Sequence, residues 1–146
     1  MYDLSLDPAR VQIDVVHGFL STCYWSLGIR REVVEKAIAH SIVCGAYLST
    51  TGEQVGFARA VSDHASFAYL CDVFVLEPHR GHGLATRMVN TLAAHPELQT
   101  LRRWLLATRD AHEVYARIGF VPVDATRWME RVLPREGWQV RETPRG

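Results

Sequence analysis

An almost unbroken apolar run at residues 67–76 constrains the fold most, because such a run suits a strand that is covered on both faces. The run stops at Glu77-Pro78, and a loop that contains two glycines follows. From Leu84 to Leu92, apolar residues recur at the spacing of one helix face. The segment therefore predicts a central strand, a tight glycine loop and a helix packed on the sheet.

Apolar spacing elsewhere predicts further elements around this unit. Residues 15–20 and 31–41 have the pattern of two helices. Residues 42–48 and 54–61 have the pattern of two strands joined by a turn. The other expected elements are a small strand near Val11, a strand at 101–107, a short helix at 111–118, strands at 120–123 and 128–132, and a loose tail at 134–146. This order predicts one α/β domain over residues 1–146 with a mixed sheet.

Composition excludes several classes of protein. The 146 residues are 48% hydrophobic and 22% charged, as in a globular domain, and 16 basic residues balance 16 acidic ones. Nucleic-acid binders usually carry a basic surplus, so no nucleic-acid partner is expected. Three widely spaced cysteines do not suit a secreted disulfide framework. No apolar run is long enough to span a membrane and the N-terminus lacks the order of a signal peptide, so we expect a cytoplasmic protein with no membrane partner.

The glycine loop between the expected strand and helix has the features of an anion site. Gly81 and Gly83 allow a tight turn, and the first N–H groups of the helix have no intrahelical acceptor. Together with Arg80, they would suit a phosphate or pyrophosphate. The Gly-Lys-Ser/Thr of a P-loop is absent, and Thr86 stands where a dinucleotide fingerprint has its third glycine. Taken alone, the loop is better explained as the packed start of a helix.

A second segment changes this interpretation. The chain resembles the GNAT superfamily of acyl-coenzyme A-dependent N-acetyltransferases, whose cofactor motif Arg/Gln-x-x-Gly-x-Gly/Ala is matched by Arg80, Gly83 and Ala85. The motif follows a strand that ends in Val73-Phe74-Val75. The family's later tyrosine, on a short helix that ends in Gly-Phe, is matched by Tyr115 with Gly119-Phe120. The resemblance is strong from about residue 55 to residue 123.

The resemblance implies an acetyl-CoA-dependent enzyme with a splayed mixed sheet flanked by helices. In the family, loop amides bind the pyrophosphate of coenzyme A, and the preceding strand pairs with the pantetheine arm. Thr108 stands where many relatives have an asparagine that bonds this arm. The cofactor-binding residues implied are Phe74, Val75, Arg80, Gly81, His82, Gly83, Leu84, Ala85, Thr86 and Thr108.

Two residues have implied catalytic roles, each beside a structural alternative. Tyr115 has the family's general-acid position, and a phenol with a pKa near ~10 can protonate a departing thiolate. Its alternative is an aromatic support beneath the Gly-Phe turn. Asp72 interrupts the apolar strand and is the first candidate for the base that takes a proton from the acceptor amine. Its alternative is a carboxylate paired with Arg59, and the residues leave both open.

The acceptor side is less defined. Tyr24 and Trp25 lie between the first two expected helices, where relatives build the acceptor pocket, although core packing explains them equally well. Arg59 is the further expected substrate contact. His64 and His112 are better explained as surface residues. Cys71 is expected to be an inert buried thiol, which favours direct transfer over an acyl-cysteine route.

The expected function is therefore transfer of acetyl from acetyl-CoA to a primary amine, chiefly of a small molecule, by direct attack in a ternary complex. A CoA-binding sensor without turnover and a protein N-terminal acetyltransferase are the alternatives. His79 and His82 form a close pair without a third ligand, so no metal is predicted. Relatives often pair as dimers, which leaves a homodimer open.

Overall fold

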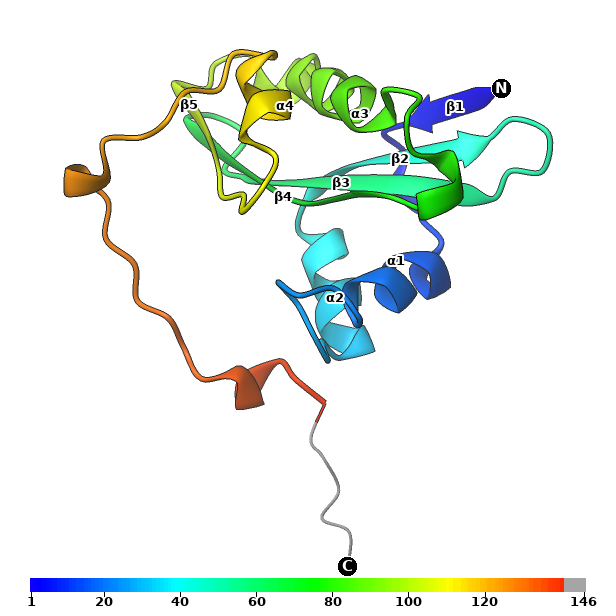
Figure 1. The fold of residues 1–146 in the computed structure, drawn as a ribbon, viewed down its shortest axis with the longest axis horizontal. Helices are drawn as coiled ribbons and strands as arrows, with labels where there is room; N and C mark the ends of the chain where they lie inside the picture. The colour runs from blue at the N-terminus through cyan, green and yellow to red at the C-terminus, as the bar shows by residue number, and fades with distance from the viewer. Residues whose placement is uncertain (141–146) are drawn as a thin grey trace, which may run out of the picture.

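A computed structural model describes residues 1–140 and builds them around one five-stranded sheet (Figure 1). The strands lie in chain order, so that neighbours in sequence are neighbours in the sheet. The first four pair antiparallel, and β4 pairs parallel with β5. The strands are β1 (Tyr2–Ser5), β2 (Ile42–Leu48), β3 (Gln54–Ser62), β4 (Phe67–Val75) and β5 (Arg103–Leu106). This mixed sheet confirms the predicted fold class.

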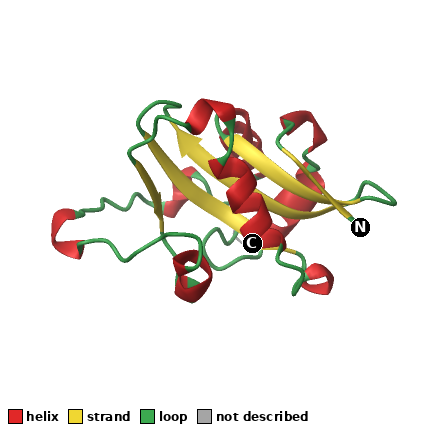
Figure 2. Cartoon of the chain, turned by 90° about the horizontal axis from the view of Figure 1, so that it is seen from above, coloured by secondary structure: helices red, strands yellow, loops and turns green. Residues whose placement is uncertain are grey.

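Helices cover both faces of the sheet, and each face has its own core (Figures 1 and 2). On one face, α1 (Ile13–Leu20) and α2 (Arg31–Ala39) pack on Phe57 and Phe74. On the other face, α3 (Leu84–Ala93) and α4 (His112–Ala116) lie over the sheet. The α3 residues that the helical spacing identified are buried there, namely Leu84, Met88, Val89 and Leu92. Burial on both faces explains why β2 and β3 are almost continuously apolar.

The sheet opens between β4 and β5, as the family resemblance implied. The two strands pair only from Phe67 with Arg103 to Leu70 with Leu106. Beyond Leu70, no strand among the described residues pairs with β4 on this side. At the same point the β3–β4 register shifts, and Asp72 adopts a positive φ of 55°. This bulge bends β4 away from β5 and leaves backbone groups of β4 facing a gap.

Three predicted strands are wrong. The small strand near Val11 is absent; the chain there leaves a 3-10 turn at Pro8–Arg10, and the N-terminal strand is β1, paired with β2. The segments 120–123 and 128–132 form no strand within the described residues. Residues 121–137 are exposed throughout, and no described strand pairs with their backbone. Pro122, which has no N–H, further weakens the first of the two.

The end of the described chain contacts the body again. Two backbone hydrogen bonds join residues 138–140 to the α1–α2 loop, from Arg30 N–H to Trp138 O at 2.9 Å and from Val140 N–H to Gly28 O at 2.7 Å. A single bridge pairs Ile29 with Gln139. Of the tail expected at 134–146, residues 141–146 lie outside the described residues. Among the described helices, none is long and apolar enough to cross a membrane.

Candidate active site

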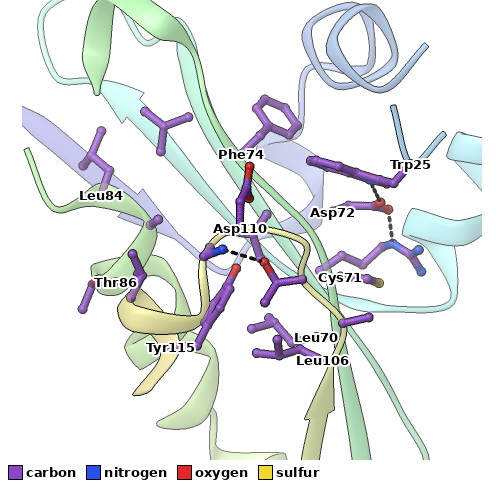
Figure 3. A pocket seen from close by; sticks show the side chains of 18 of the residues that line it. Trp25, Leu70, Cys71, Asp72, Phe74, Leu84, Thr86, Leu106, Asp110 and Tyr115 are labelled. Atoms are coloured by element: carbon purple, nitrogen blue, oxygen red, sulfur yellow. Dashed lines mark hydrogen bonds and ion pairs between the residues drawn. The ribbon is translucent and has the colours of Figure 1, made fainter. Parts of the chain in front are cut away.

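A pocket of about 950 Å³ lies where β4 separates from β5 (Figure 3). One end is formed by the glycine loop and the start of α3, and the other by the α1–α2 loop. Of the thirteen cofactor and acceptor residues expected from the sequence, only His82 does not line it. The residues that do are Tyr24, Trp25, Arg59, Phe74, Val75, Arg80, Gly81, Gly83, Leu84, Ala85, Thr86 and Thr108, and the two catalytic candidates Asp72 and Tyr115 join them.

The loop that enters α3 presents backbone N–H groups to this pocket. Gly81 and Gly83 have φ of 85° and 70°, a region that only glycine adopts readily. A Cβ added at either position would meet no atom within 4 Å, so backbone conformation rather than space within the chain requires glycine. The first intrahelical bond is Arg87 N–H to Gly83 O. The amides of Leu84, Ala85 and Thr86 therefore have no intrahelical acceptor, and such amides at a helix N-terminus suit an anion.

Contacts with the sheet hold the loop in place. The Nε–H of Arg80 donates to Val75 O at 2.9 Å, which fixes the loop to the end of β4. His79 Nδ1 lies 3.0 Å from the Tyr2 hydroxyl on β1. The ring of His82 packs at 5.5 Å from the Tyr2 ring, away from the pocket. His82 can therefore contribute its backbone to the loop, but its side chain supports the fold.

The backbone of β4 also faces the pocket. Leu76 N–H donates to Val55 O on β3 at 2.8 Å. Successive residues of a strand direct their backbone groups to opposite sides, so the N–H of Val75 faces the unpaired side. Val75 O faces this side too, since it accepts from Arg80. The open edge thus offers a donor to an extended ligand or to a carbonyl oxygen.

Tyr115 extends from α4 into the pocket (Figure 3). Its ring packs edge-on against Phe120, 5.9 Å away, which fits both the acid and the supporting role considered above. Burial, with a smaller contribution from Tyr24, raises the pKa of Tyr115 above its ordinary value. The phenol is therefore protonated at neutral pH and able to donate a proton.

Thr108, two residues beyond the end of β5, also lines the pocket. Its hydroxyl oxygen accepts from the N–H of Ala111 at 3.0 Å, within the loop that leads into α4. The hydroxyl hydrogen is still available to a second partner, because a hydroxyl both donates and accepts.

Asp72 lies on the bulge at the acceptor end of the pocket, and two donors bind its carboxylate (Figure 3). Arg59 Nε is 2.9 Å from Oδ2, and Trp25 Nε1 is 3.1 Å from Oδ1. Arg59 also donates to the Ser41 hydroxyl at 3.0 Å. The ion pair considered as the alternative is thus present. It does not exclude proton transfer, because each carboxylate oxygen keeps a lone pair for a further donor.

Aromatic rings line the acceptor end. Tyr24 and Trp25 pack edge-to-face at 5.2 Å, and both remain about half exposed, at 51% and 41%. Phe19 of α1 stacks on Phe74 of β4 with ring centroids 4.1 Å apart. The Arg109 guanidinium lies 3.8 Å from the Tyr24 ring centroid. This contact joins the α1–α2 loop to the β5–α4 loop across the pocket.

Sequence reasoning missed two of these residues. Phe19 belonged to the predicted apolar face of the first helix, but a spacing pattern cannot show that its ring lies over β4. Nothing local connects Arg109 with Tyr24, since 85 positions separate them and only the tertiary fold makes them neighbours.

The other reactive side chains lie outside the pocket or are inert. His64 pairs with Glu97 at 3.1 Å on the surface, and His112 does not line the pocket. Burial raises the pKa of the Cys71 thiol to about 12, so little thiolate exists at neutral pH. Residues 1–140 contain no group of three or more His, Cys, Asp or Glu side chains placed to hold a metal ion.

Comparisons with known proteins identify the family of this chain. The profile of the "Acetyltransferase (GNAT) family" matches residues 14–120. A candidate acetyltransferase of Gibberella zeae, FG08082, is 30% identical over 135 residues, with 80% of this chain and 76% of that one covered. The crystal structure of a GNAT-family protein from Xanthomonas campestris pv. campestris is 44% identical, with a TM-score of 0.86 and 92% and 94% of the two chains covered.

More distant structures share the fold alone. Glucosamine-6-phosphate N-acetyltransferase from Arabidopsis thaliana is 13% identical, with a TM-score of 0.68 and 92% and 99% of the two chains covered. The family itself is established by the profile match and by the relatives at 30% and 44% identity. The chain belongs to the GNAT family of acetyltransferases.

Proposed function

We propose that this protein transfers acetyl from acetyl-CoA to the primary amine of a small molecule, by direct attack while both substrates are bound. One observation carries the proposal: a single pocket joins the amides of α3, the open edge of β4, Tyr115 and the aromatic end with Asp72. A shared pocket lets the two substrates meet, so no covalent acyl-enzyme is needed. The raised pKa of Cys71 supports this route.

The cofactor end has the donors that coenzyme A requires. Amides at the start of α3 would hold the pyrophosphate, with Arg80 at the rim and the Thr86 hydroxyl beside it. The open edge of β4 would pair with the pantetheine arm in the manner of an added strand. When bound, acetyl-CoA supplies an electrophilic thioester carbonyl and a thiolate leaving group.

Three groups of the chain would then act on the reaction. The Val75 N–H donates to the carbonyl oxygen as negative charge develops there. The amine nitrogen forms a bond to the carbonyl carbon while the carbon–sulfur bond breaks, and Tyr115 gives its proton to the departing sulfur. Asp72 takes the proton that the amine loses. Tyr24 and Trp25 exclude water from the acceptor and offer ring faces to its cationic form.

The experiment that tests the proposal has two steps. Titration calorimetry with coenzyme A is expected to show binding at a single site. A screen that detects free thiol, with acetyl-CoA and a panel of small amines, amino acids, polyamines and peptides with free N-termini, is then expected to identify a small amine as acceptor. Binding without turnover on any acceptor would favour a sensor, and turnover on peptides alone would favour an N-terminal acetyltransferase.

Replacing Asp72 by Asn tests the proton acceptor. We expect kcat/KM to fall by about 10² near neutral pH, where the acceptor is mostly an ammonium ion. The defect should shrink as the pH rises, because the amine then arrives already deprotonated. The measurement is the pH profile of both proteins with the acceptor that the screen identifies.

Arg59→Gln is the matched variant, since it breaks the same ion pair but keeps the carboxylate. Its melting temperature should fall with that of Asp72→Asn, while its pH profile keeps the wild-type shape. If both variants show the same pH-independent loss, Asp72 is a structural partner of Arg59 and not the base.

A further inference from the structure

The sheet face beneath α1 and α2 carries side chains that the two helices leave partly uncovered. Alternate residues of a strand share a face, so Phe57, Arg59 and Val61 of β3 all lie on this one. Phe57 is completely buried in the core that α1 and α2 form, whereas Val61 is 41% exposed. Tyr69 lies directly opposite Val61 on β4, and both side chains line the pocket. We call Val61 and Tyr69 the apolar strip.

The apolar strip extends the pocket beyond Asp72. Along β4 the order is Val75, whose N–H would bind the thioester carbonyl, then Asp72 and then Tyr69. The strip lies about 7 Å beyond the row that pairs Arg59 with Cys71, because two residues of a strand span that length. An acceptor with its amine between the thioester and Asp72 would therefore extend the rest of its atoms over the strip.

Rings of the α1–α2 loop lie at the same end of the pocket. The bond from Trp25 Nε1 to Asp72 Oδ1, at 3.1 Å, holds the indole beside the carboxylate (Figure 3). Trp25 is nevertheless 41% exposed. Tyr24 packs edge-to-face against it, and the Arg109 guanidinium already lies over the Tyr24 ring. The indole is thus the ring that is free to stack on a flat apolar group.

The charges of the pocket do not favour an acceptor with several ammonium groups. Arg59 already neutralises Asp72, with Nε 2.9 Å from Oδ2. The lining contains three arginines and two aspartates, namely Arg59, Arg80, Arg117, Asp72 and Asp110. A polycation is best recognised by an excess of carboxylates. An amino sugar would need several hydrogen-bond partners, whereas the strip offers it a single hydroxyl, on Tyr69.

We propose that the acceptor is a primary amine joined by a short chain to an aromatic ring, with the amine at Asp72 and the ring between Trp25 and the apolar strip. This inference rests on the proposed acetyl transfer and names its substrate class. The ring takes no part in the reaction: the amine nitrogen bonds to the acetyl carbon, its proton goes to Asp72, and coenzyme A leaves as the thiol. Burial of the ring should favour such an acceptor by about 10- to 100-fold over one that leaves the strip empty.

Release of thiol from acetyl-CoA tests the acceptor class, with phenethylamine, putrescine, glucosamine and a short peptide with a free N-terminus as probes. We expect kcat/KM for phenethylamine to exceed that for each other probe by about tenfold or more. Val61→Asp places a charge on the strip, so it should lower the value for phenethylamine by about tenfold or more without lowering that for putrescine. Val61→Thr keeps the branched shape and should cause a smaller fall in the same direction. Val61 is partly exposed, so both variants should fold.

Leu27→Asp is the matched control, because Leu27 is also an exposed apolar residue, at 51%, on the loop that carries Trp25, but does not line the pocket. It should keep the wild-type ratio of phenethylamine to putrescine turnover. A wild type that prefers putrescine, glucosamine or the peptide, or a Val61→Asp protein that keeps this ratio, would overturn the proposed acceptor and leave acetyl transfer intact. Coenzyme A binding without thiol release on any probe would overturn both.

Discussion

Tyr115→Phe is expected to lower kcat by about 10² to 10⁴ while the affinity for coenzyme A changes little. The substitution removes the hydroxyl that we propose protonates the departing sulfur, and it keeps the ring that packs against Phe120. Thiol release under saturating substrates gives kcat, and titration calorimetry gives the affinity. In the wild type, burial raises the pKa of Tyr115, so activity should not fall on the alkaline side until the pH passes the ordinary phenol value near ~10.

Tyr47→Phe is the matched control for this variant. The Tyr47 hydroxyl is buried, has no hydrogen-bond partner among the described residues and lies outside the pocket. Its loss should leave kcat unchanged. A Tyr115→Phe protein that turns over as fast as the wild type would show that the phenol is an aromatic support beneath the Gly119-Phe120 turn, and not the acid.

Gly83→Glu is expected to abolish measurable coenzyme A binding. Gly83 has φ of 70° and immediately precedes α3. The amides of the residues beside it would face the pyrophosphate. A carboxylate placed there repels the phosphates and occupies their space, and the Cβ adds about 1–2 kcal/mol of backbone strain. Calorimetry measures the loss of binding, and thermal unfolding measures the strain.

Gly52→Glu separates these two effects. Gly52 has φ of 76° in the β2–β3 turn, and a Cβ there also meets no atom within 4 Å, so the backbone strain matches that at Gly83. Its melting temperature should fall by a similar amount while coenzyme A binding persists. If Gly83→Glu binds coenzyme A as tightly as Gly52→Glu does, the amides at the start of α3 are not the pyrophosphate site.

Elements that depend only on a few neighbouring residues could be predicted from the sequence. The apolar run of β4, the positive-φ glycines and the apolar face of α3 are each determined by a few neighbouring residues, and each was predicted within a few positions. The opening between β4 and β5 came from the family resemblance. No local pattern shows that the ladder ends at Leu70, because this depends on the bulge at Asp72.

Contacts between distant segments could not be predicted. The bond from Trp25 to Asp72 and the position of Arg109 over Tyr24 depend on how loops meet after the sheet has formed. Residues 128–132 show a different limit. They have strand-forming side chains, but a strand also needs a neighbour, and no described segment pairs with them.

The open edge of β4 has a consequence for how this protein tolerates heat. Part of β4 lacks the hydrogen bonds that a complete ladder with β5 would supply, and a ligand that bridges the gap would restore them. The melting temperature should therefore follow the concentration of coenzyme A, since a ligand present at 100 times its Kd stabilises the folded state by about 2.7 kcal/mol. Cellular supply of the nucleotide would then govern the lifetime of the protein as well as its turnover.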